Sequence, residues 1–287
     1  MSDLSSGKGH TDENFPVASW LVRADCRAPI MAFYTFARAA DDIADHPDAA
    51  AHDKLARLDA MRAGLDGEGA PEAMALARMA QERGLDLVQA HDLLGAFVQD
   101  CTVNRMADWD ALIAYCRLSA MPVGRFVLDV HGEDRAIWPM SDALCAALQV
   151  INHLQDCGKD YRTIDRVYLP DDMLAAAGTG VAALGADRAS DALRGVIVAC
   201  AQRTGELLKQ SAPFASAIRD PRLAAEVAVI QRLAEDLTAM LLIRDPLSET
   251  VHHSKPRAAA LATGAIVRLG LTKLRAGFSR IRAGIYA

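Results

Sequence analysis

The chain has 287 residues and a mass of 30.8 kDa, and 52% of its residues are hydrophobic whereas only 5% are aromatic. This apolar content excludes a disordered chain, and the shortage of strand-favouring aromatics argues against a β-sandwich or barrel. The net charge of −6 argues against a general nucleic-acid-binding protein.

The charge is unevenly distributed along the chain. No acidic residue follows Glu249, whereas seven of the 31 bases do: Lys255, Arg257, Arg268, Lys273, Arg275, Arg280 and Arg282. The preceding part carries the other 24 bases against 37 acids, a net charge of −13. A basic end on an acidic body suggests contact with an anionic surface such as a membrane.

Nearly every segment follows the helical period, after a polar stretch at 1–12 that we expect to be loose. Ile30, Phe33, Tyr34 and Ala37 form the stripe of an amphipathic helix, which should end at His46-Pro47. Glycines and prolines separate further predicted helices at roughly 51–65, 71–83, 86–104, 109–131, 141–161, 188–211, 221–244 and 256–282. Without an alternating strand pattern, the sequence predicts an all-α fold with one domain over 13–287, ending in a basic helix at 250–287. This helix either lies on a membrane or packs on the domain as its last core helix.

The six cysteines form no Cys-x-x-Cys pair, which indicates buried thiols in a reducing compartment. The N-terminus lacks the apolar core of a secretory signal, and no uncharged apolar run approaches the ~18 residues needed to span a bilayer. We therefore expect a cytoplasmic protein that can rest peripherally on the inner membrane.

Two segments carry pairs of aspartates at helical spacing. Asp41 and Asp45 lie four residues apart, so they share one helix face, and Arg38 and Tyr34 precede them on that face. In the second segment the same face carries four polar residues, namely Gln149, Asn152, Asp156 and Asp160. A single such pair is usually a solvated surface, but two aligned pairs that continue apolar helix faces indicate a site.

Carboxylates that face one another inside a bundle repel strongly unless cations lie between them. Oxygen ligands from two facing helices suit Mg²⁺, which completes its coordination shell with water and phosphate oxygens. Arg38 on the same face can bind a phosphate through two parallel hydrogen bonds. The pattern predicts a site that binds a diphosphate through metal within a helical cavity.

These features resemble the squalene/phytoene synthase family, whose members carry two aspartate-rich motifs on facing helices of an isoprenoid-synthase fold. The resemblance covers roughly residues 13–245 and includes the segments Tyr115-Cys116, Ser119-Ala120, Val123-Gly124 and Arg166-Val-Tyr-Leu-Pro170. It implies a helical bundle with a central cavity that takes a prenyl diphosphate. The residues implied to hold Mg²⁺ are Asp41, Asp42, Asp45, Asp156 and Asp160. Those implied to bind the substrate headgroup are Tyr34, Arg38, Gln149, Asn152, Arg166 and Tyr168.

Departures from the commonest family pattern indicate which branch of the family the chain resembles. The segment 13–19 has no base, although synthases that condense two prenyl diphosphates tend to carry a Ser/Lys-rich segment there, and Lys159 replaces the usual acid. The strings Asn-Phe-Pro-Val-Ala-Ser at 14–19 and Ser-Ala-Met-Pro-Val-Gly-Arg at 119–125 resemble the hydroxysqualene synthase branch of bacterial hopanoid pathways. The resemblance implies a carbon–oxygen lyase that converts presqualene diphosphate and water into hydroxysqualene and diphosphate without NADPH. Such an enzyme would act with a presqualene diphosphate synthase.

Two alternatives stay open at this point. The first is a condensing synthase that makes squalene or phytoene from two prenyl diphosphates. The second is a non-catalytic assembly factor on the same fold, which need not retain the carboxylates.

Several residues have weaker assignments. Phe33, Tyr34, Phe36, Met121 and Phe126 are candidate cavity walls, although we expect Phe36 and Phe126 to be ordinary core. His153 lies about 100° around the helix from Asn152, which places it behind the site or in the core. His252 and His253 are interpreted as loop residues.

Overall fold

The structure is a computed structural model that describes residues 22–46 and 48–285, with side chains up to Leu274. The N-terminal predictions, including the loose segment 1–12 and the segment 13–19, lie outside these residues. The elements in chain order are α1 (Ala24–Ala44), α2 (Ala51–Leu65), α3 (Pro71–Arg83), α4 (Val88–Asp100), β1 (Arg105–Met106), α5 (Trp109–Ser119), α6 (Met121–His131), η1 (Arg135–Ile137), α7 (Trp138–Ile164), β2 (Val167–Pro170), α8 (Asp171–Ala176), η2 (Val181–Gly185), α9 (Asp191–Ser211), α10 (Phe214–Ala217), α11 (Pro221–Leu241) and α12 (Lys255–Ile285).

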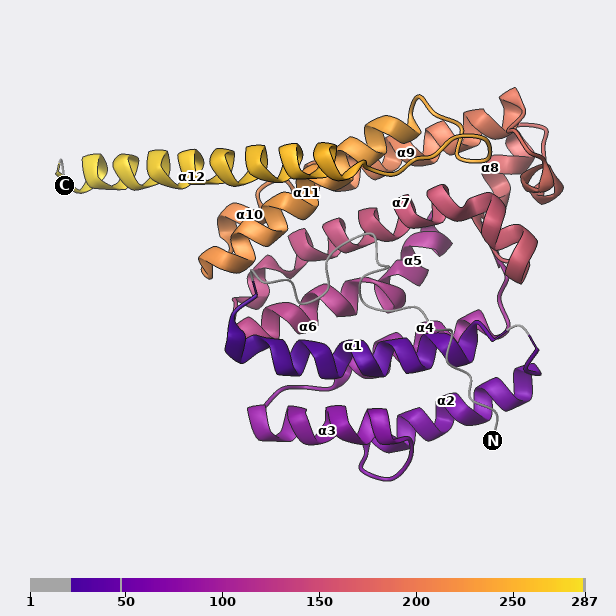
Figure 1. Ribbon diagram of the computed structural model, residues 1–287, viewed down its shortest axis with the longest axis horizontal. Helices are drawn as coiled ribbons and strands as arrows, with labels where there is room; N and C mark the ends of the chain where they lie inside the picture. Colours follow the sequence, from indigo (N-terminus) through magenta and orange to yellow (C-terminus); the bar gives the residue numbers. More distant parts are fainter. Residues whose placement is uncertain (1–21, 47, 286–287) are drawn as a thin grey trace.

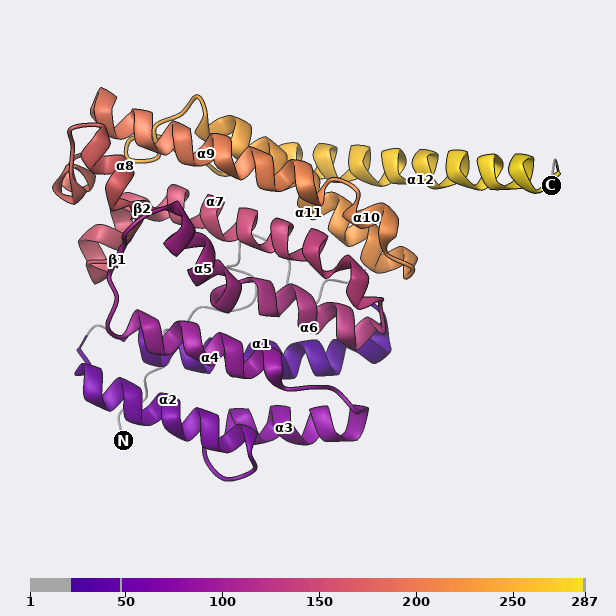
Figure 2. The same cartoon turned by 180° about the vertical axis from the view of Figure 1, so that it is seen from behind.

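The helices are stacked in layers that follow one another from the bottom to the top of Figure 1. Helices α2 and α3 form one end, α1 and α4 follow, α5, α6 and α7 lie in the middle, and α9, α11 and α12 form the other end. The view from behind in Figure 2 shows β1 and β2 in the middle of this stack, at one end of the helices. The predicted all-α fold is confirmed.

The sequence interpretation needs two corrections. The pattern at 109–131 is two helices, because Ala120 leaves helical geometry at φ −125° and Pro122 lies in the first turn of the next helix. The prediction without strands overlooked β1 and β2, which pair in parallel. They are two and four residues long, too short for alternation to show.

The stretch Trp109–His131 is long and apolar enough for a membrane span, but 44% of its most apolar window is buried within the body. Because this stretch is divided at Ala120, its two halves pack as separate core helices. This is the behaviour of core helices that happen to be apolar.

Buried apolar side chains form two main clusters. The larger one joins α5, α7, α9 and α11, and the smaller one joins α1 to α4. Phe126 of α6 enters the smaller cluster and stacks on Phe33 at a ring-centroid distance of 4.2 Å. Phe36 and Phe126 are therefore core residues, as expected, and the candidate site lies between the layers that the two clusters hold together.

Gly124 allows α6 to approach α7 closely. A Cβ at this position would lie 2.5 Å from Ser141 Oγ and 2.6 Å from Cys145 Sγ. We expect Gly124→Ala to destabilise the protein by about 1–3 kcal/mol, measured by urea denaturation, because the helices must separate. Gly195 of α9 has no atom within 4 Å of such a Cβ and is the matched control, for which alanine should be neutral or stabilising. Equal losses for both variants would show that the effect is not due to the contact with α7.

Helix α12 packs on the body with one face and leaves the other exposed. At its start, Asp236 of α11 accepts hydrogen bonds from Arg257 Nε at 2.7 Å and from His253 Nε2 at 3.0 Å. Further along, Ala265 is buried, and Lys273 Nζ donates to the Ile218 carbonyl at 3.2 Å. Figure 1 shows the rest of the helix projecting beyond the body.

Candidate functional site

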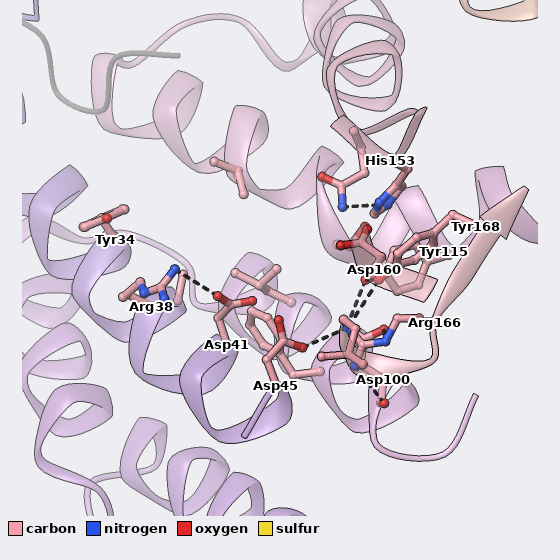
Figure 3. A pocket seen from close by; sticks show the side chains of 17 residues that line it. Tyr34, Arg38, Asp41, Asp45, Asp100, Tyr115, His153, Asp160, Arg166 and Tyr168 are labelled. Carbon is pink, nitrogen blue, oxygen red and sulfur yellow. Dashed lines mark hydrogen bonds and ion pairs between the residues drawn. The ribbon is translucent and has the colours of Figure 1, made fainter. Parts of the chain in front are cut away.

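A cavity of about 330 Å³ lies between α1, α4, α5 and α7. Strand β2 lies at one end of this cavity, and the side chain of Val123 from α6 also lines the cavity. The side chains that line it are Tyr34, Ala37, Arg38, Asp41, Asp45, Leu93, Phe97, Asp100, Tyr115, Ser119, Val123, Gln149, His153, Asp160, Ile164, Arg166 and Tyr168. We call this cavity the central pocket; Figure 3 shows its side chains.

Helix α1 contributes the first aspartate pair. Asp41 and Asp45 both line the central pocket, as the four-residue spacing predicts. Arg38 contacts Asp41 at 3.1 Å and Asp42 at 2.6 Å, so Asp42 lies beside the pocket lining and pairs with Arg38. This predicted metal ligand is therefore not in the pocket lining.

Helix α7 presents a pocket-facing stripe that differs from the expected one. The stripe consists of Gln149, His153, Asp160 and Ile164, whereas Asn152 and Asp156 are not in the lining. His153, expected behind the site or in the core, is a wall residue instead. The rotation of α7 about its axis explains the difference. Gln149 and His153 are only about 40° apart around a helix, and the pocket lies on their side of the stripe. The side chain of Asp156 still acts on the pocket, because its charge raises the pKa of Asp160.

A buried hydrogen-bond network closes the end of the pocket. Arg166 Nη1 donates to Asp45 Oδ1 at 2.8 Å, and Nη2 donates to the Asp100 carbonyl at 3.1 Å. Tyr115 donates its hydroxyl to Asp100 Oδ2 at 2.9 Å and lies 3.4 Å from the hydroxyl of Tyr168. The network ties the first aspartate motif to α4, α5 and β2.

Burial and mutual repulsion disturb the ionisation of the pocket acids. Burial and the Asp45 charge raise the pKa of Asp41 to about 7, and burial and the Asp156 charge raise the pKa of Asp160 to about 7. Although 39% of the Asp41 side chain is accessible, that part faces the pocket rather than the outer surface (Figure 3). Burial also raises the pKa of Asp100 to about 6, against the opposing effect of Arg166.

The charge balance of the pocket lining indicates whether the pocket suits a metal ion. Four carboxylates, those of Asp41, Asp45, Asp100 and Asp160, face only two guanidinium groups, Arg38 and Arg166. An anionic headgroup would be repelled from this lining unless further positive charge entered with it. Hard carboxylate oxygens that face one another across a cavity suit a divalent cation such as Mg²⁺. Among the described residues no group of three acids, histidines or cysteines is close enough to surround an ion on its own.

Some lining residues could not be found from the sequence. Asp100, Leu93 and Phe97 come from α4, where they belong to an ordinary amphipathic pattern. Among the proposed walls only Tyr34 reaches the pocket; Phe33 and Met121 are buried in the core. The signal for Tyr115 and Ser119 was the family pattern, and the remaining lining depends on how the helices rotate against one another.

Comparison with known proteins decides the family. Residues 8–257 match the squalene/phytoene synthase family. The chain belongs to that family. It is 56% identical to a hydroxysqualene synthase of Zymomonas mobilis, covering 90% of this chain and 89% of that protein. Hydroxysqualene synthases of Rhodopseudomonas palustris and Sinorhizobium fredii are 55% and 48% identical over 88% of this chain. The sequence-based assignment to this branch of the family is confirmed.

Solved structures agree with the fold. A squalene synthase from Alicyclobacillus acidocaldarius superposes with a TM-score of 0.70 at 31% identity, covering 78% of this chain and 86% of that one. A dehydrosqualene synthase solved with a ligand superposes with a TM-score of 0.72 at 20% identity, covering 90% and 92%. The two similarities confirm an isoprenoid-synthase helical fold.

Proposed function

We propose that this squalene/phytoene synthase family member is a hydroxysqualene synthase that converts presqualene diphosphate and water into hydroxysqualene and diphosphate. The observation that carries the proposal is 48–56% identity to three hydroxysqualene synthases over nearly the whole chain. A condensing phytoene synthase of Mycobacterium tuberculosis reaches only 31% identity over 58% of this chain. The pocket acids argue against the non-catalytic alternative, because a scaffold does not need repelling carboxylates inside it.

The proposed cofactor is Mg²⁺, held by Asp41 and Asp45 from one side and by Asp160, with Asp156 beside it, from the other. When bound, the ion would supply Lewis acidity and neutralise the charge that grows on the departing diphosphate. Arg38 and Arg166 are placed to contact the same headgroup, with Tyr34, Gln149 and Tyr168 as further proposed contacts, whereas Asn152 lies outside the pocket lining. The apolar side chains of Leu93, Phe97 and Val123 would shield the cationic carbon skeleton from bulk water.

A product assay tests the proposed function. The purified protein is supplied with presqualene diphosphate and Mg²⁺ without NADPH, and the lipid product is identified by mass spectrometry. We expect hydroxysqualene, with its oxygen derived from ¹⁸O-labelled water. Formation of squalene or phytoene directly from two simpler prenyl diphosphates would contradict the proposal. Presqualene diphosphate is itself the product of a head-to-head condensation, so the enzyme would act after a presqualene diphosphate synthase.

We further propose that the outer face of α12 rests on an anionic membrane, as a peripheral protein of the inner membrane would. Val267, Leu271 and Leu274 are 58%, 53% and 60% exposed on this face, and the exposed Arg268 flanks them. Substrate and product are long hydrocarbons that partition into lipid, so an enzyme acting on them gains from resting there. An apolar stripe with flanking bases on an otherwise acidic protein is the composition of an interfacial helix.

We expect Val267→Glu/Leu271→Glu to weaken binding to phosphatidylglycerol-containing vesicles by at least about tenfold in a sedimentation assay, because two charges would enter the apolar boundary. Val88→Glu is the matched control, because Val88 is also an exposed valine, 44% accessible, but lies at the start of α4. Equal binding by both variants would show that α12 does not contact the membrane.

A further inference from the structure

The ring of His153 lies on the same wall of the central pocket as residues proposed to bind the diphosphate headgroup. It stacks on Tyr168 with 3.4 Å between ring centroids and 15° between ring planes. The Tyr168 hydroxyl in turn lies 3.4 Å from Arg166 Nη1, which donates to Asp45 at 2.8 Å. Figure 3 shows His153 on the side of Asp160 and Tyr168, across the pocket from the first aspartate motif. His153 is therefore close to the proposed headgroup site.

A hydrogen bond from Gln149 fixes the position of the proton on this ring. Gln149 Nε2 lies 3.0 Å from His153 Nε2. An amide nitrogen can only donate, so the imidazole Nε2 accepts, and in a neutral ring the proton is then on Nδ1. Burial and the positive charge of Arg166 lower the pKa of His153 to about 3, so the ring is neutral at physiological pH.

The N–H group at Nδ1 opens into the pocket without a protein partner. Within the described part of the chain Nδ1 makes no hydrogen bond. Only 8% of His153 is accessible, yet Nδ1 is not enclosed, whereas the unpartnered Nε2 of His131 is. Because His153 lines the central pocket, this donor faces a space that a ligand can occupy. Nearly all buried N–H groups in proteins have a partner, so a free donor in a pocket wall indicates that a ligand supplies the acceptor.

We propose that His153 binds an oxygen of the substrate diphosphate through Nδ1–H, and that Gln149 is the positioning residue that keeps the proton on Nδ1. The inference rests on the proposed function, because it requires a prenyl diphosphate in the central pocket. A hydrogen bond to a charged oxygen is stronger than one between two neutral groups. As negative charge grows on the departing diphosphate, this hydrogen bond strengthens.

The pair of Gln149 and His153 supplies a donor without supplying a base. Gln149 occupies the lone pair of Nε2, and Nδ1 carries the proton, so the ring has no lone pair free toward the carbocation. A free imidazole lone pair would remove a proton from the cation or form a bond to it, and the alcohol would be lost. His153 can therefore bind the headgroup and leave the cation to react with water.

Titration calorimetry with inorganic diphosphate and Mg²⁺ separates the donor from the ring. His153→Phe keeps an aromatic ring to stack on Tyr168 but loses the donor. His153→Asn loses the ring but keeps an amide N–H close to the position of Nδ1. We expect Kd to rise about tenfold in His153→Phe and less than about threefold in His153→Asn, with folding checked by thermal melting. The reverse order would show that His153 acts only by packing.

Nuclear magnetic resonance of ¹⁵N-labelled histidine locates the proton in the wild type. The His153 resonances are identified by their absence in His153→Asn. The proton should be on Nδ1, and the Nδ1 resonance should move when Mg²⁺ and inorganic diphosphate are added. In Gln149→Leu the ring should also populate the form with its proton on Nε2. A wild-type proton on Nε2, or an Nδ1 resonance that diphosphate leaves unmoved, would overturn the inference.

The control is His131→Phe, because His131 is equally buried but lies outside the pocket lining, with its Nδ1 2.9 Å from the Val127 carbonyl. It should bind diphosphate as the wild type does. An unchanged Kd in folded His153→Phe would overturn the inference and leave the proposed function intact. A wild type that binds no diphosphate would contradict the proposed headgroup site as well. If diphosphate binds through His153 but no hydroxysqualene forms, only the proposed reaction is contradicted.

Discussion

Asp160→Asn should abolish turnover and at the same time stabilise the metal-free protein. Asp160 is one of the acids proposed to hold Mg²⁺, so its loss should lower kcat at least about 100-fold. The same side chain is disfavoured without metal, because burial and the neighbouring Asp156 raise its pKa from 3.8 to about 7. Among the described residues it forms no ion pair that asparagine would remove. We therefore expect opposite effects on activity and stability.

The pH dependence gives the sign of the stability change. Between about pH 4 and 7 the folded protein keeps a proton on Asp160 that the unfolded chain releases, so stability falls as pH rises through this window. Asparagine removes that loss. The gain should be on the order of 1 kcal/mol at pH 8, or about 2–4 °C in Tm, after allowing for water in the pocket, and smaller at pH 5.

Thermal melts and a turnover assay check this prediction. Thermal melts at pH 5 and pH 8 give the stability change, and Asp187→Asn, at an exposed loop position, is the control that should show none. Mg²⁺ with inorganic diphosphate should raise the Tm of the wild type more than that of Asp160→Asn. A variant that is less stable at pH 8 and remains active would show that Asp160 is a structural residue.

The sequence predicts the helices and half of the pocket lining, because the spacing of residues alone determines which of them share one face of a helix. The four-residue interval between Asp41 and Asp45 places both on one face, and the structure confirms that both face the cavity. The predicted helices at 51–65 and 71–83 coincide with α2 and α3, because glycine and proline breakers flank them.

Spacing does not determine how far a helix is rotated against its neighbours. The stripe Gln149, Asn152, Asp156 and Asp160 has the correct period, yet α7 turns His153 into the pocket in place of Asn152. Asp100 likewise ends an unremarkable helix, and its partner Arg166, directly before β2, comes more than sixty residues later in the chain. Contacts of that kind depend on tertiary packing.

Arg166→Met should cause a large loss of stability as well as of activity. The guanidinium is buried and is shared by Asp45, by the Asp100 carbonyl and, at 3.9 Å, by the Asp100 carboxylate. Removing it leaves the Asp100 carboxylate, 5% exposed, without its cation. Breaking a buried pair from one side costs about 3–5 kcal/mol, which should appear in urea denaturation as a lower midpoint with an unchanged m-value.

The neighbouring pair of Arg105 and Asp165 is the matched control. Its nitrogen–oxygen distance of 2.6 Å is at least as short, but its side chains are 30% and 65% exposed, against 7% for Arg166. Arg105→Met should therefore cost less than about 1 kcal/mol. Similar losses in the two variants would show that burial of the pair is not what makes Arg166 important.

A double variant separates the structural role of Arg166 from its proposed contact with diphosphate. Burial already raises the pKa of Asp100 to about 6, so without Arg166 the destabilisation should be greater at pH 8 than at pH 5, where the acid is protonated. Asp100→Asn/Arg166→Met removes the unpaired charge while asparagine can still accept from Tyr115, so it should recover most of the lost stability. Turnover should stay at least about 100-fold below wild type, because the cation beside the headgroup is absent. Recovery of turnover together with stability would contradict a role for Arg166 in diphosphate binding and would leave it as the residue that holds α4, β2 and the first aspartate motif in register.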